Sequence, residues 1–501
     1  MANQAPASGK KNSFASSFGF VMAAAGSAVG LGNLWGFPYK TGAYGGAAFV
    51  LVYILCVLFM GIVAMTCEII LGRGAQANPI TALKKVKPAF GFIGLAAIVI
   101  PFFITCYYSV LGGYTLFSTG ASLTNTGKDF SAIADGMTNF MGNPLASVIC
   151  TVIFLLMAAL VIFGGVQKGI EKASKVLMPA LFVILVGVMI YSLCLGEGVM
   201  EGLKFYILQL DFQALGFEGV TKAMGQAFFS LSLGMGIMIS YGSYTGKEIN
   251  VGKSVMQICI FDSVIALFAG LAIFPAAYHF MAVYDVPAES LGLGGFKLMY
   301  YTLPQVFASM GTVGSIVGFL FFVMVVIAAL TSVMSLLEVV TQFIIQRWKV
   351  SRKIAVVIPF VLISVLSIPV SLSLGGAFTV SGMDLLTFMD EMTNTVLMPV
   401  VAFAGTVIAG WFLSRQEKHT LIGTKGKWYP DFVHGMSRFV TPVLILFVEI
   451  SGVVTSIQGN AQYWPVVVAG YALALLCAII YFLALRNADT GCNADELALK
   501  K

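Results

Sequence analysis

Charged residues are scarce in this chain. Asp, Glu, Lys and Arg make up only 10% of its 501 residues, whereas 59% are hydrophobic. Soluble globular proteins carry about 25% charged residues. A chain with this little charge cannot cover a water-facing surface, so the composition excludes a soluble enzyme, a nucleic-acid-binding protein and a disordered protein.

Histidine is also rare, and the cysteines form no pattern. The three histidines, His279, His419 and His434, lie far apart in the sequence. None of the eight cysteines belongs to a CxxC motif or has a histidine nearby. These absences argue against a metal centre, a disulfide framework and a nucleophilic catalytic site. We therefore expect neither an enzyme nor a cofactor, and we interpret the cysteines as packing residues.

Long apolar runs dominate the chain instead. A helix that crosses a membrane needs about 20 mostly apolar residues, and twelve stretches are candidates. They cover residues 18–40, 46–71, 90–120, 144–164, 173–195, 219–244, 254–282, 313–346, 354–371, 382–413, 436–456 and 463–485. Segments 198–212 and 286–310 are mixed in character, and we expect them to be extracellular loops with short surface helices. The sequence thus predicts an all-α integral membrane protein with one twelve-helix domain at 18–485, between terminal segments 1–17 and 486–501.

Basic residues gather on alternate loops. If the N-terminus is cytoplasmic, the inside loops are 1–17, 72–89, 165–172, 245–253, 347–353, 414–435 and the C-terminal tail. These loops and the adjoining span ends hold every Lys and Arg except Lys40, Lys128, Lys204, Lys222 and Lys297. Because loops rich in Lys and Arg stay in the cytoplasm, both termini are predicted to be cytoplasmic. Topology alone explains these clusters, so no nucleic-acid partner is expected.

Six acidic residues lie within or at the ends of apolar runs. They are Glu68, Asp262, Glu338, Asp390, Glu391 and Glu449. An ionised side chain at mid-bilayer is costly, so such residues usually face the bundle interior or an aqueous cavity. A buried, hydrogen-bonded structural carboxyl group is the alternative. For Glu68 and Glu449 the two interpretations are equally good.

Glycines interrupt the first and the sixth apolar runs. The first run, GFVMAAAGSAVGLGNLWGFPY, clusters glycines before Pro38, and the sixth contains Gly234 and Gly236 in its middle. Unwound backbone is tolerated in a membrane only beside a cavity. The two runs occupy corresponding positions if spans 1–5 (about 18–195) and spans 6–10 (about 219–413) are inverted repeats, followed by spans 11–12 (about 436–485). The pair predicts that spans 1 and 6 are unwound at mid-membrane around a transport site, and close helix packing at glycine is the alternative.

Unwound helices expose backbone groups that bind ions. A half-helix N-terminus offers N–H groups to a carboxylate, and a half-helix C-terminus offers carbonyl oxygens to a cation. Sodium takes such oxygens together with hydroxyl, amide and carboxylate groups. Suitable side chains near the interruptions and in span 8 are Asn33, Ser230, Ser232, Asp262, Thr331, Ser332 and Ser335. Back-bonding to its own helix is the alternative for each hydroxyl group.

These segments resemble the neurotransmitter:sodium symporter family, in particular its bacterial members. The strongest motif is AGSAVGLGNLWGFPYKTGAYGGAAF at 25–49, and it is followed by EIILGR, CYYSVLGGYTL, GQAFFSLSLGMGIMISYGSY and LTSVMSLLE at 68–73, 106–116, 225–244 and 330–338. The resemblance extends over nearly the whole chain. It implies twelve transmembrane helices with helices 1 and 6 broken, and this family is itself one of the examples behind the general rule on broken helices.

The resemblance also implies two sodium sites and a substrate pocket. The residues implied for sodium are Gly26, Val29, Ala328, Thr331 and Ser332 at one site and Ala28, Asn33, Ser230 and Asp262 at the other. The residues implied for the substrate are Ala28, Gly30, Leu31, Gly32, Ile104, Tyr108, Phe229, Ser230, Ser232, Met235, Ser332 and Leu336. Tyr108 would hold the substrate carboxylate, and Phe229 would close the pocket from outside. The apolar lining implies a neutral, hydrophobic L-amino acid, and the carboxylate of Asp262 implies independence from chloride.

Two gates depart from the family pattern. Gly36 stands where the family usually has an arginine that pairs with an acid of span 10, here Asp390. Lys40, four residues later, is a candidate substitute. On the cytoplasmic side Lys11 stands in place of another arginine, and Gln346 in place of its acidic partner.

The sequence therefore predicts a sodium-coupled symporter in the inner (plasma) membrane of a bacterium, which imports its substrate by alternating access. The expected partners are a small-molecule amino acid, sodium as the coupling ion and the lipid bilayer, and a homodimer is left open. Two alternatives also stay open: proton-coupled or sodium-independent transport, and a channel or a transport-dead amino-acid sensor on the same fold.

Overall fold

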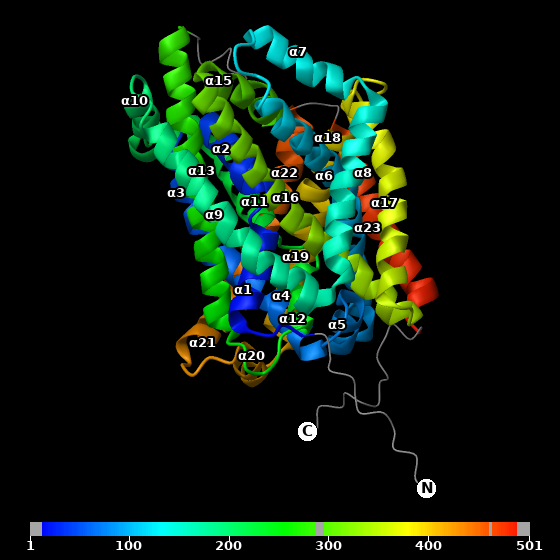
Figure 1. Cartoon of the computed structure of the whole chain (residues 1–501). Coiled ribbons are helices and arrows are strands. Elements are labelled where there is room, and N and C mark those ends of the chain that lie inside the picture. The colour runs from blue at the N-terminus through cyan, green and yellow to red at the C-terminus, as the bar shows by residue number, and fades with distance from the viewer. Residues whose placement is uncertain (1–12, 286–294, 460–462, 488–501) are drawn as a thin grey trace.

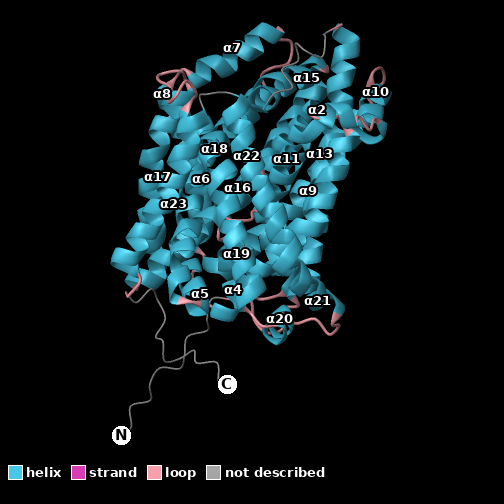
Figure 2. Cartoon of the chain, turned by 180° about the vertical axis from the view of Figure 1, so that it is seen from behind, coloured by secondary structure: helices cyan, strands magenta, loops and turns pink. Residues whose placement is uncertain are grey.

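The computed structural model describes residues 13–285, 295–459 and 463–487, which form a bundle of helices running between two ends of the molecule (Figure 1). The short helices α5 (Pro79–Val86), α20 (Arg415–Ile422) and α21 (Trp428–Gly435) lie at the end where α1 begins, which we call the terminal end. Helices α7 (Phe130–Met141) and α15 (Leu303–Ser309) lie at the opposite end. The view from behind shows that the loops gather mainly at these two ends (Figure 2).

All twelve predicted spans are helical, with bounds that mostly differ from the prediction by a few residues. Spans 1–6 are α1 (Ser17–Ala28) with η1 (Gly32–Gly36) and α2 (Phe37–Ala43); α3 (Ala47–Cys56) with η2 (Val57–Gly61) and α4 (Ile62–Ala75); η3 (Pro88–Phe90) with α6 (Gly91–Ser122); α8 (Pro144–Phe163); η4 (Val166–Glu171) with α9 (Lys172–Leu193); and α11 (Phe212–Ser230) with α12 (Ile237–Ser243). Spans 7–12 are α13 (Val251–Tyr284); α16 (Gly311–Trp348); α17 (Arg352–Leu374); α18 (Leu385–Glu391) with η8 (Met392–Leu397) and α19 (Met398–Phe412); α21 with η9 (Met436–Val440) and α22 (Thr441–Gly459); and α23 (Trp464–Ile480) with η11 (Tyr481–Leu485).

One of the two predicted extracellular loops is described in full and the other in part. Segment 198–212 contains α10 (Val199–Leu203) and η5 (Lys204–Leu208). The described part of 286–310 contains α14 (Gly295–Lys297), η7 (Leu298–Thr302) and α15, whereas 286–294 lies outside the described residues. Most of the predicted terminal segments 1–17 and 486–501 also lies outside them.

Length and composition separate continuous from broken spans. Ten of the described helices are long and apolar enough to cross a membrane, and the bent pair at the start of the chain adds an eleventh. The remaining span is interrupted between α11 and α12. Continuous helices satisfy their backbone polar groups internally, as an apolar solvent requires, so the two broken spans are the exceptions that call for explanation.

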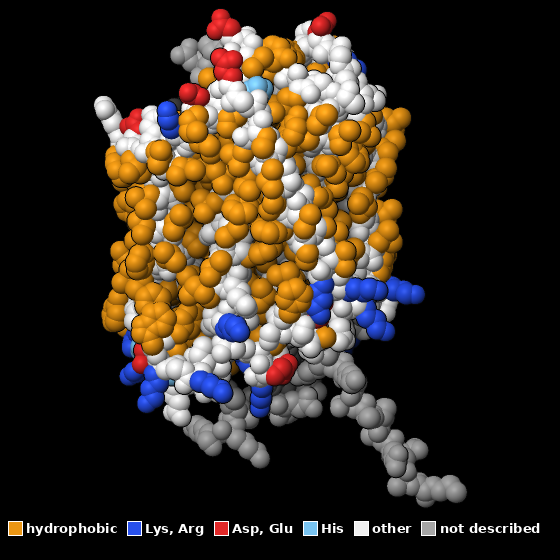
Figure 3. Space-filling view, turned by 60° about the vertical axis from the view of Figure 1, so that its left-hand side comes forward, with side chains coloured by type: hydrophobic (Ala, Val, Ile, Leu, Met, Phe, Trp, Pro, Cys, Tyr) orange, Lys and Arg blue, Asp and Glu red, His pale blue; other side chains and the backbone are white. Residues whose placement is uncertain are grey.

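Side-chain chemistry marks the two ends and the middle of the bundle. Figure 3 shows hydrophobic side chains in a broad band around the visible face, with most Lys and Arg at the terminal end and Asp and Glu more frequent at the other. The most apolar windows of α6 and α16 are each 67% buried, against 28% for those of spans 5 and 12. Spans 3 and 8 are therefore central helices, and they pack beside the broken spans.

Candidate substrate and ion site

Span 1 breaks where the sequence predicts. Helix α1 ends at Ala28, η1 begins at Gly32, and the two halves meet at 51°. Gly30 lies within the break, where an added Cβ would come within 2.6 Å of the Tyr108 hydroxyl oxygen and 2.7 Å of the Ser332 hydroxyl oxygen. Glycine is required here because any side chain would separate span 1 from spans 3 and 8.

Span 6 breaks between Ser230 and Ile237. Ser232, Gly234 and Gly236 have φ angles of 53°, 75° and 66°, in the left-handed region that favours glycine. Left-handed backbone costs a residue with a side chain about 1–2 kcal/mol. Contacts with other helices offset that cost at Ser232.

Two neighbouring helices hold the unwound segment of span 6. The Ser232 hydroxyl donates a hydrogen bond to the Ser27 carbonyl oxygen at 2.9 Å, which joins the two broken spans. The Gly234 N–H donates to Oε1 of Glu68 in α4 at 2.7 Å. The carboxyl group of Glu68 therefore satisfies a backbone donor that the broken helix cannot, which supports its structural interpretation.

Replacing Gly234 with alanine should destabilise the protein strongly. An added Cβ would lie 2.2 Å from the Met398 carbonyl oxygen, and the backbone at this position has positive φ. We expect the thermal midpoint in detergent to fall by at least a few degrees. Gly225→Ala is the matched control, because that glycine lies in α11 with open space around its Cα. Equal midpoints for the two variants would contradict this account of the break.

A narrow cavity lies between the two breaks. It measures about 20 Å³ and is lined by all the predicted substrate residues except Leu31 and Ser230, with Ser27 and Ile237 in addition. The Leu31 N–H donates to the Tyr108 hydroxyl oxygen at 2.8 Å, and the Ser230 hydroxyl turns toward Asp262. This volume holds about one water molecule, so an amino acid enters only when the lining moves apart.

Four side chains form a buried polar cluster on one side of this cavity. The Asp262 carboxylate of α13 accepts hydrogen bonds from the Asn33 amide at 2.8 Å, the Ser230 hydroxyl at 2.8 Å and the Tyr53 hydroxyl at 3.1 Å. Asp262 is fully buried. None of the ion pairs found among the described residues includes it. The cluster therefore supplies oxygen atoms and one carboxyl group to a small cation or a proton.

A second group of oxygen atoms joins spans 1 and 8. The Ser332 hydroxyl lies 3.4 Å from the Val29 carbonyl oxygen and 3.2 Å from that of Ala328. The Thr331 hydroxyl donates to the Ala328 carbonyl at 3.0 Å, and an added Cβ at Gly26 would come within 3.2 Å of Thr331. The five residues of the other predicted sodium set are thus brought together. Ala28 lines the cavity between the two groups.

A larger cavity, about 280 Å³, lies toward the opposite end. Gly32, Tyr108 and Phe229 line both cavities, so they form the partition between them. Gly36, Lys40 and Asp390 line only the larger one.

The gate residues predicted at this end contact partners that the sequence does not indicate. The Lys40 ammonium group donates to the Gln226 amide oxygen at 2.7 Å, and the Gln226 amide N–H donates to the Gly32 carbonyl at 2.8 Å. Asp390 accepts from the Asn394 amide at 2.7 Å. Lys40 is therefore linked to the break in span 1 through Gln226.

The terminal end is closed by contacts between spans 6, 8 and 9. The Glu338 carboxylate in α16 accepts from the Tyr244 hydroxyl at 2.8 Å and forms a bidentate ion pair with Arg352 at the start of α17. Gln346 accepts from the Asn78 backbone N–H at 2.8 Å, which ties the end of span 8 to α5. Lys11, its expected gate partner, lies outside the described residues.

Sequence reasoning missed four of these contacting residues. Gln226 and Tyr244 lie inside the motif at 225–244 but were assigned no role, and Tyr53 and Arg352 lie in none of the quoted motifs; the partners of all four are on other spans. Glu338 was recognisable as an intramembrane acid, and such a residue needs a buried partner. A basic residue at the start of the next span is a signal that points to Arg352.

Known proteins share this architecture. The family model of the sodium:neurotransmitter symporter family matches residues 11–128 and 127–488. An uncharacterized sodium-dependent transporter of Bacillus subtilis is 35% identical over 463 residues, which are 88% of this chain and 98% of that protein. The human sodium- and chloride-dependent neutral and basic amino acid transporter B(0+) is 26% identical over 407 residues, 67% of this chain and 63% of that protein.

A solved structure of a similar protein has the same fold. The crystal structure of MhsT in complex with L-phenylalanine superposes with a TM-score of 0.79 at 34% identity and covers 88% of this chain and all of that one. The fold predicted from the sequence is confirmed, and the matched family consists of secondary transporters, not enzymes. The chain belongs to the sodium:neurotransmitter symporter family.

Proposed function

We propose that this protein is a sodium-coupled symporter that imports a neutral, hydrophobic L-amino acid by alternating access and independently of chloride. Sodium-dependent transport is the property of the family. The substrate, the chloride independence and the roles of individual residues are proposals that rest on the geometry of the two breaks.

One observation carries the proposal: among the described residues, the hydrogen-bond donors to the buried Asp262 carboxylate are all neutral. A buried negative charge needs a counter-charge nearby. A sodium ion among Asn33, Ser230 and Asp262 would supply it, and the negative charge of the carboxylate would make a bound chloride unnecessary. A second sodium ion would bind between the carbonyl groups of span 1 and the hydroxyl groups of Thr331 and Ser332.

The substrate class follows from the lining of the small cavity. Ile104, Phe229, Met235 and Leu336 present apolar side chains, and no Lys, Arg, Asp or Glu lines the cavity in the described part of the chain. The Leu31 N–H at the break in span 1 and the Tyr108 hydroxyl, which bind each other in this conformation, are donors that suit a substrate carboxylate. MhsT, whose structure was solved with L-phenylalanine, is a relative with such a ligand.

The cycle requires both ends to open in turn. In the described conformation Glu338 and Arg352 close the terminal end, and Phe229 separates the substrate cavity from the larger one. We propose that both termini are cytoplasmic, in a bacterial inner membrane, because the terminal end carries most of the basic residues. The larger cavity is then the extracellular entrance.

A competition screen tests the substrate. Each of the twenty amino acids is added in excess to proteoliposomes that take up a radiolabelled hydrophobic amino acid along a sodium gradient. We expect competition from neutral, hydrophobic L-amino acids and none from Asp, Glu, Lys or Arg. Competition by charged amino acids would refute the proposed pocket.

Lys40→Met should loosen the extracellular gate. It removes the donor to Gln226 and so weakens the link to the Gly32 carbonyl. Because a hydrogen bond to a charged group contributes about 1.5–3 kcal/mol, we expect bound substrate to leave toward the outside about tenfold faster in a dissociation assay. Lys222→Met, at another lysine of the same cavity, is the control and should keep the wild-type rate.

A second function class rests on the altered gates. Gly36 leaves Asp390 without an arginine partner, which motivates a sensor that binds an amino acid without transporting it. Counterflow of radiolabelled substrate distinguishes the two classes, because a sensor gives none and a symporter gives rapid exchange.

A further inference from the structure

A group of four residues at the terminal end lies outside the transport site. It comprises Trp411, His434, Arg438 and Phe439, and we call it the Arg438 cluster. The Arg438 guanidinium carbon lies 4.8 Å from the Trp411 ring centre and 5.9 Å from the Phe439 ring centre. The Trp411 indole N–H donates to the Arg438 carbonyl at 3.1 Å. The backbone contact and the two ring faces therefore fix the guanidinium group in place.

The two rings face away from the protein interior. Trp411 is 52% exposed and Phe439 61% exposed, and both lie where a span meets the terminal end. Exposed aromatic rings at such positions are typical of the membrane–water interface. Arg438 is thus held at the level of the lipid headgroups.

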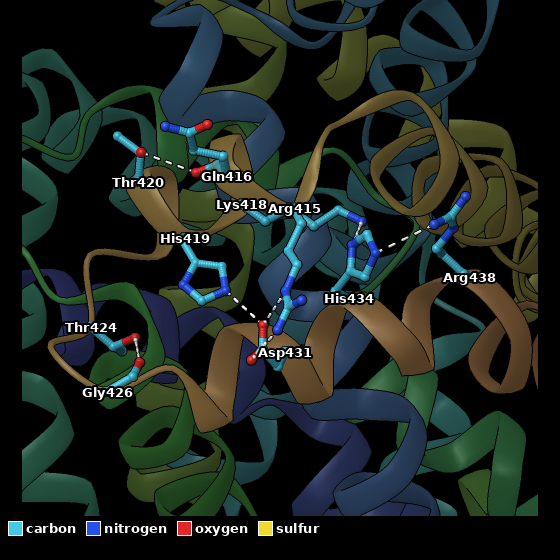
Figure 4. Close-up of polar contacts among 10 residues, drawn as sticks. All are labelled: Arg415, Gln416, Lys418, His419, Thr420, Thr424, Gly426, Asp431, His434 and Arg438. Carbon is cyan, nitrogen blue, oxygen red and sulfur yellow. Dashed lines mark hydrogen bonds and ion pairs between the residues drawn. The ribbon is translucent and has the colours of Figure 1, made fainter.

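His434 lies between two basic side chains (Figure 4). The Lys418 ammonium nitrogen is 3.0 Å from its Nδ1, and Nη1 of Arg438 is 3.4 Å from its Nε2. Burial lowers the pKa of Lys418 to about 8, so Lys418 is an ammonium group at neutral pH and donates to Nδ1. A neutral ring then carries its proton on Nε2. That N–H group faces the guanidinium N–H groups of Arg438, and two donors meet without an acceptor.

Arg438 lacks an acceptor on its other edge too. Its Nε is buried and has no hydrogen-bond partner among the described residues. None of the ion pairs found in that part of the chain includes Arg438. Asp431, one turn before His434, accepts from Arg415 at 2.6 Å and from His419 at 2.7 Å (Figure 4). Asp431 is therefore already paired.

We propose that Arg438 and His434 bind the phosphate group of an anionic phospholipid, whose acyl chains lie along Trp411 and Phe439. Both side chains are partly exposed, so a phosphate group can supply acceptors to the guanidinium Nη groups and the ring, and arginine binds phosphate in a bidentate manner. Basic pockets between membrane helices recognise anionic headgroups in this way. The exposed rings favour a lipid over free phosphate, because a soluble anion gains nothing from them. The inference does not depend on which solute the protein carries.

Native mass spectrometry of the full-length protein tests the proposal. The protein is purified from nanodiscs that contain equal amounts of phosphatidylglycerol and phosphatidylcholine. We expect the wild type to retain phosphatidylglycerol and Arg438→Gln to retain about tenfold less, since one hydrogen bond between charged groups contributes about that factor. Arg486→Gln is the control, because Arg486 lies beside an aromatic ring, Phe482, at the end of another span.

A thermal-shift assay in detergent separates binding from folding. Phosphatidylglycerol should raise the midpoint of the wild type and of Arg486→Gln but not that of Arg438→Gln, while all three keep similar midpoints without lipid. Trp411→Leu, which keeps the charge, should reduce the shift in part. Equal retention of phosphatidylglycerol by Arg438→Gln and the wild type would overturn the proposal. So would an equal thermal shift from inorganic phosphate or from phosphatidylcholine.

Discussion

Asp262→Ala should lower sodium-driven uptake in chloride-free medium by more than about tenfold. Removing one partner of a buried, hydrogen-bonded charge pair costs about 2–5 kcal/mol, and about 1.4 kcal/mol corresponds to a factor of ten. The variant leaves Asn33, Ser230 and Tyr53 around a site without negative charge. Chloride added to the medium should restore part of the activity, because an anion can replace the missing carboxylate. Uptake is measured in proteoliposomes with gluconate or chloride as the anion.

Glu449→Gln is the matched control for this experiment. Glu449 is also a buried carboxyl group within a span, but its described partner is the Tyr471 hydroxyl, at 2.7 Å, and neither residue lines the described cavities. The control should retain uptake without any response to chloride. Full chloride-free activity of Asp262→Ala would remove Asp262 from the ion site, and equal losses in both variants would indicate a general effect on folding.

Tyr108→Phe should weaken substrate binding by about 10- to 100-fold and leave sodium affinity nearly unchanged. The Tyr108 hydroxyl lies beside the break in span 1, where it accepts from the Leu31 N–H at 2.8 Å. A hydrogen bond to a charged group such as the substrate carboxylate contributes about 1.5–3 kcal/mol. Substrate and sodium affinities are obtained from equilibrium binding of radiolabelled amino acid at varied sodium concentration.

Tyr114→Phe controls for the loss of a buried hydroxyl group. Tyr114 lies on the same helix, its hydroxyl accepts a hydrogen bond from Ser147, and neither residue lines either cavity. We expect this variant to bind substrate as the wild type does. If Tyr108→Phe also bound substrate normally, the carboxylate would have to be held elsewhere, and the assignment of the small cavity would be wrong.

The fold was predictable because a membrane reduces the choices open to the chain. Each apolar run must satisfy its own backbone, so length and composition locate the spans. The glycines at 30, 234 and 236 then locate the two breaks: positive φ angles and close backbone contacts exclude most other residues at 234 and 236, and two side-chain hydroxyls leave no room for a Cβ at 30. Tyr108, Ser332 and Asn33 were predicted from the family resemblance, and all three lie beside those breaks.

The hydrogen-bond partners of the buried polar side chains could not be predicted from the sequence. Lys40 contacts Gln226, 186 positions away, and Tyr53 contacts Asp262, 209 positions away. Such pairs depend on how the helices pack against one another, and the hydrophobic periodicity of the sequence does not show this. Lys40 was expected to pair with Asp390 because it lies four residues after Gly36, where the family usually has an arginine, but its described hydrogen-bond partner is the Gln226 amide in span 6. The lack of acceptors around Arg438 could not be predicted either, because it depends on the position of His434 between Lys418 and Arg438.

The most direct test of the central claim is uptake of a radiolabelled hydrophobic amino acid into chloride-free proteoliposomes, driven by an inward sodium gradient. The same measurement is repeated with potassium in place of sodium and at several pH values. The proposed coupling predicts concentrative uptake with sodium at every pH and none with potassium. Uptake that persists in potassium and follows an inward proton gradient would contradict it and would assign Asp262 to proton coupling.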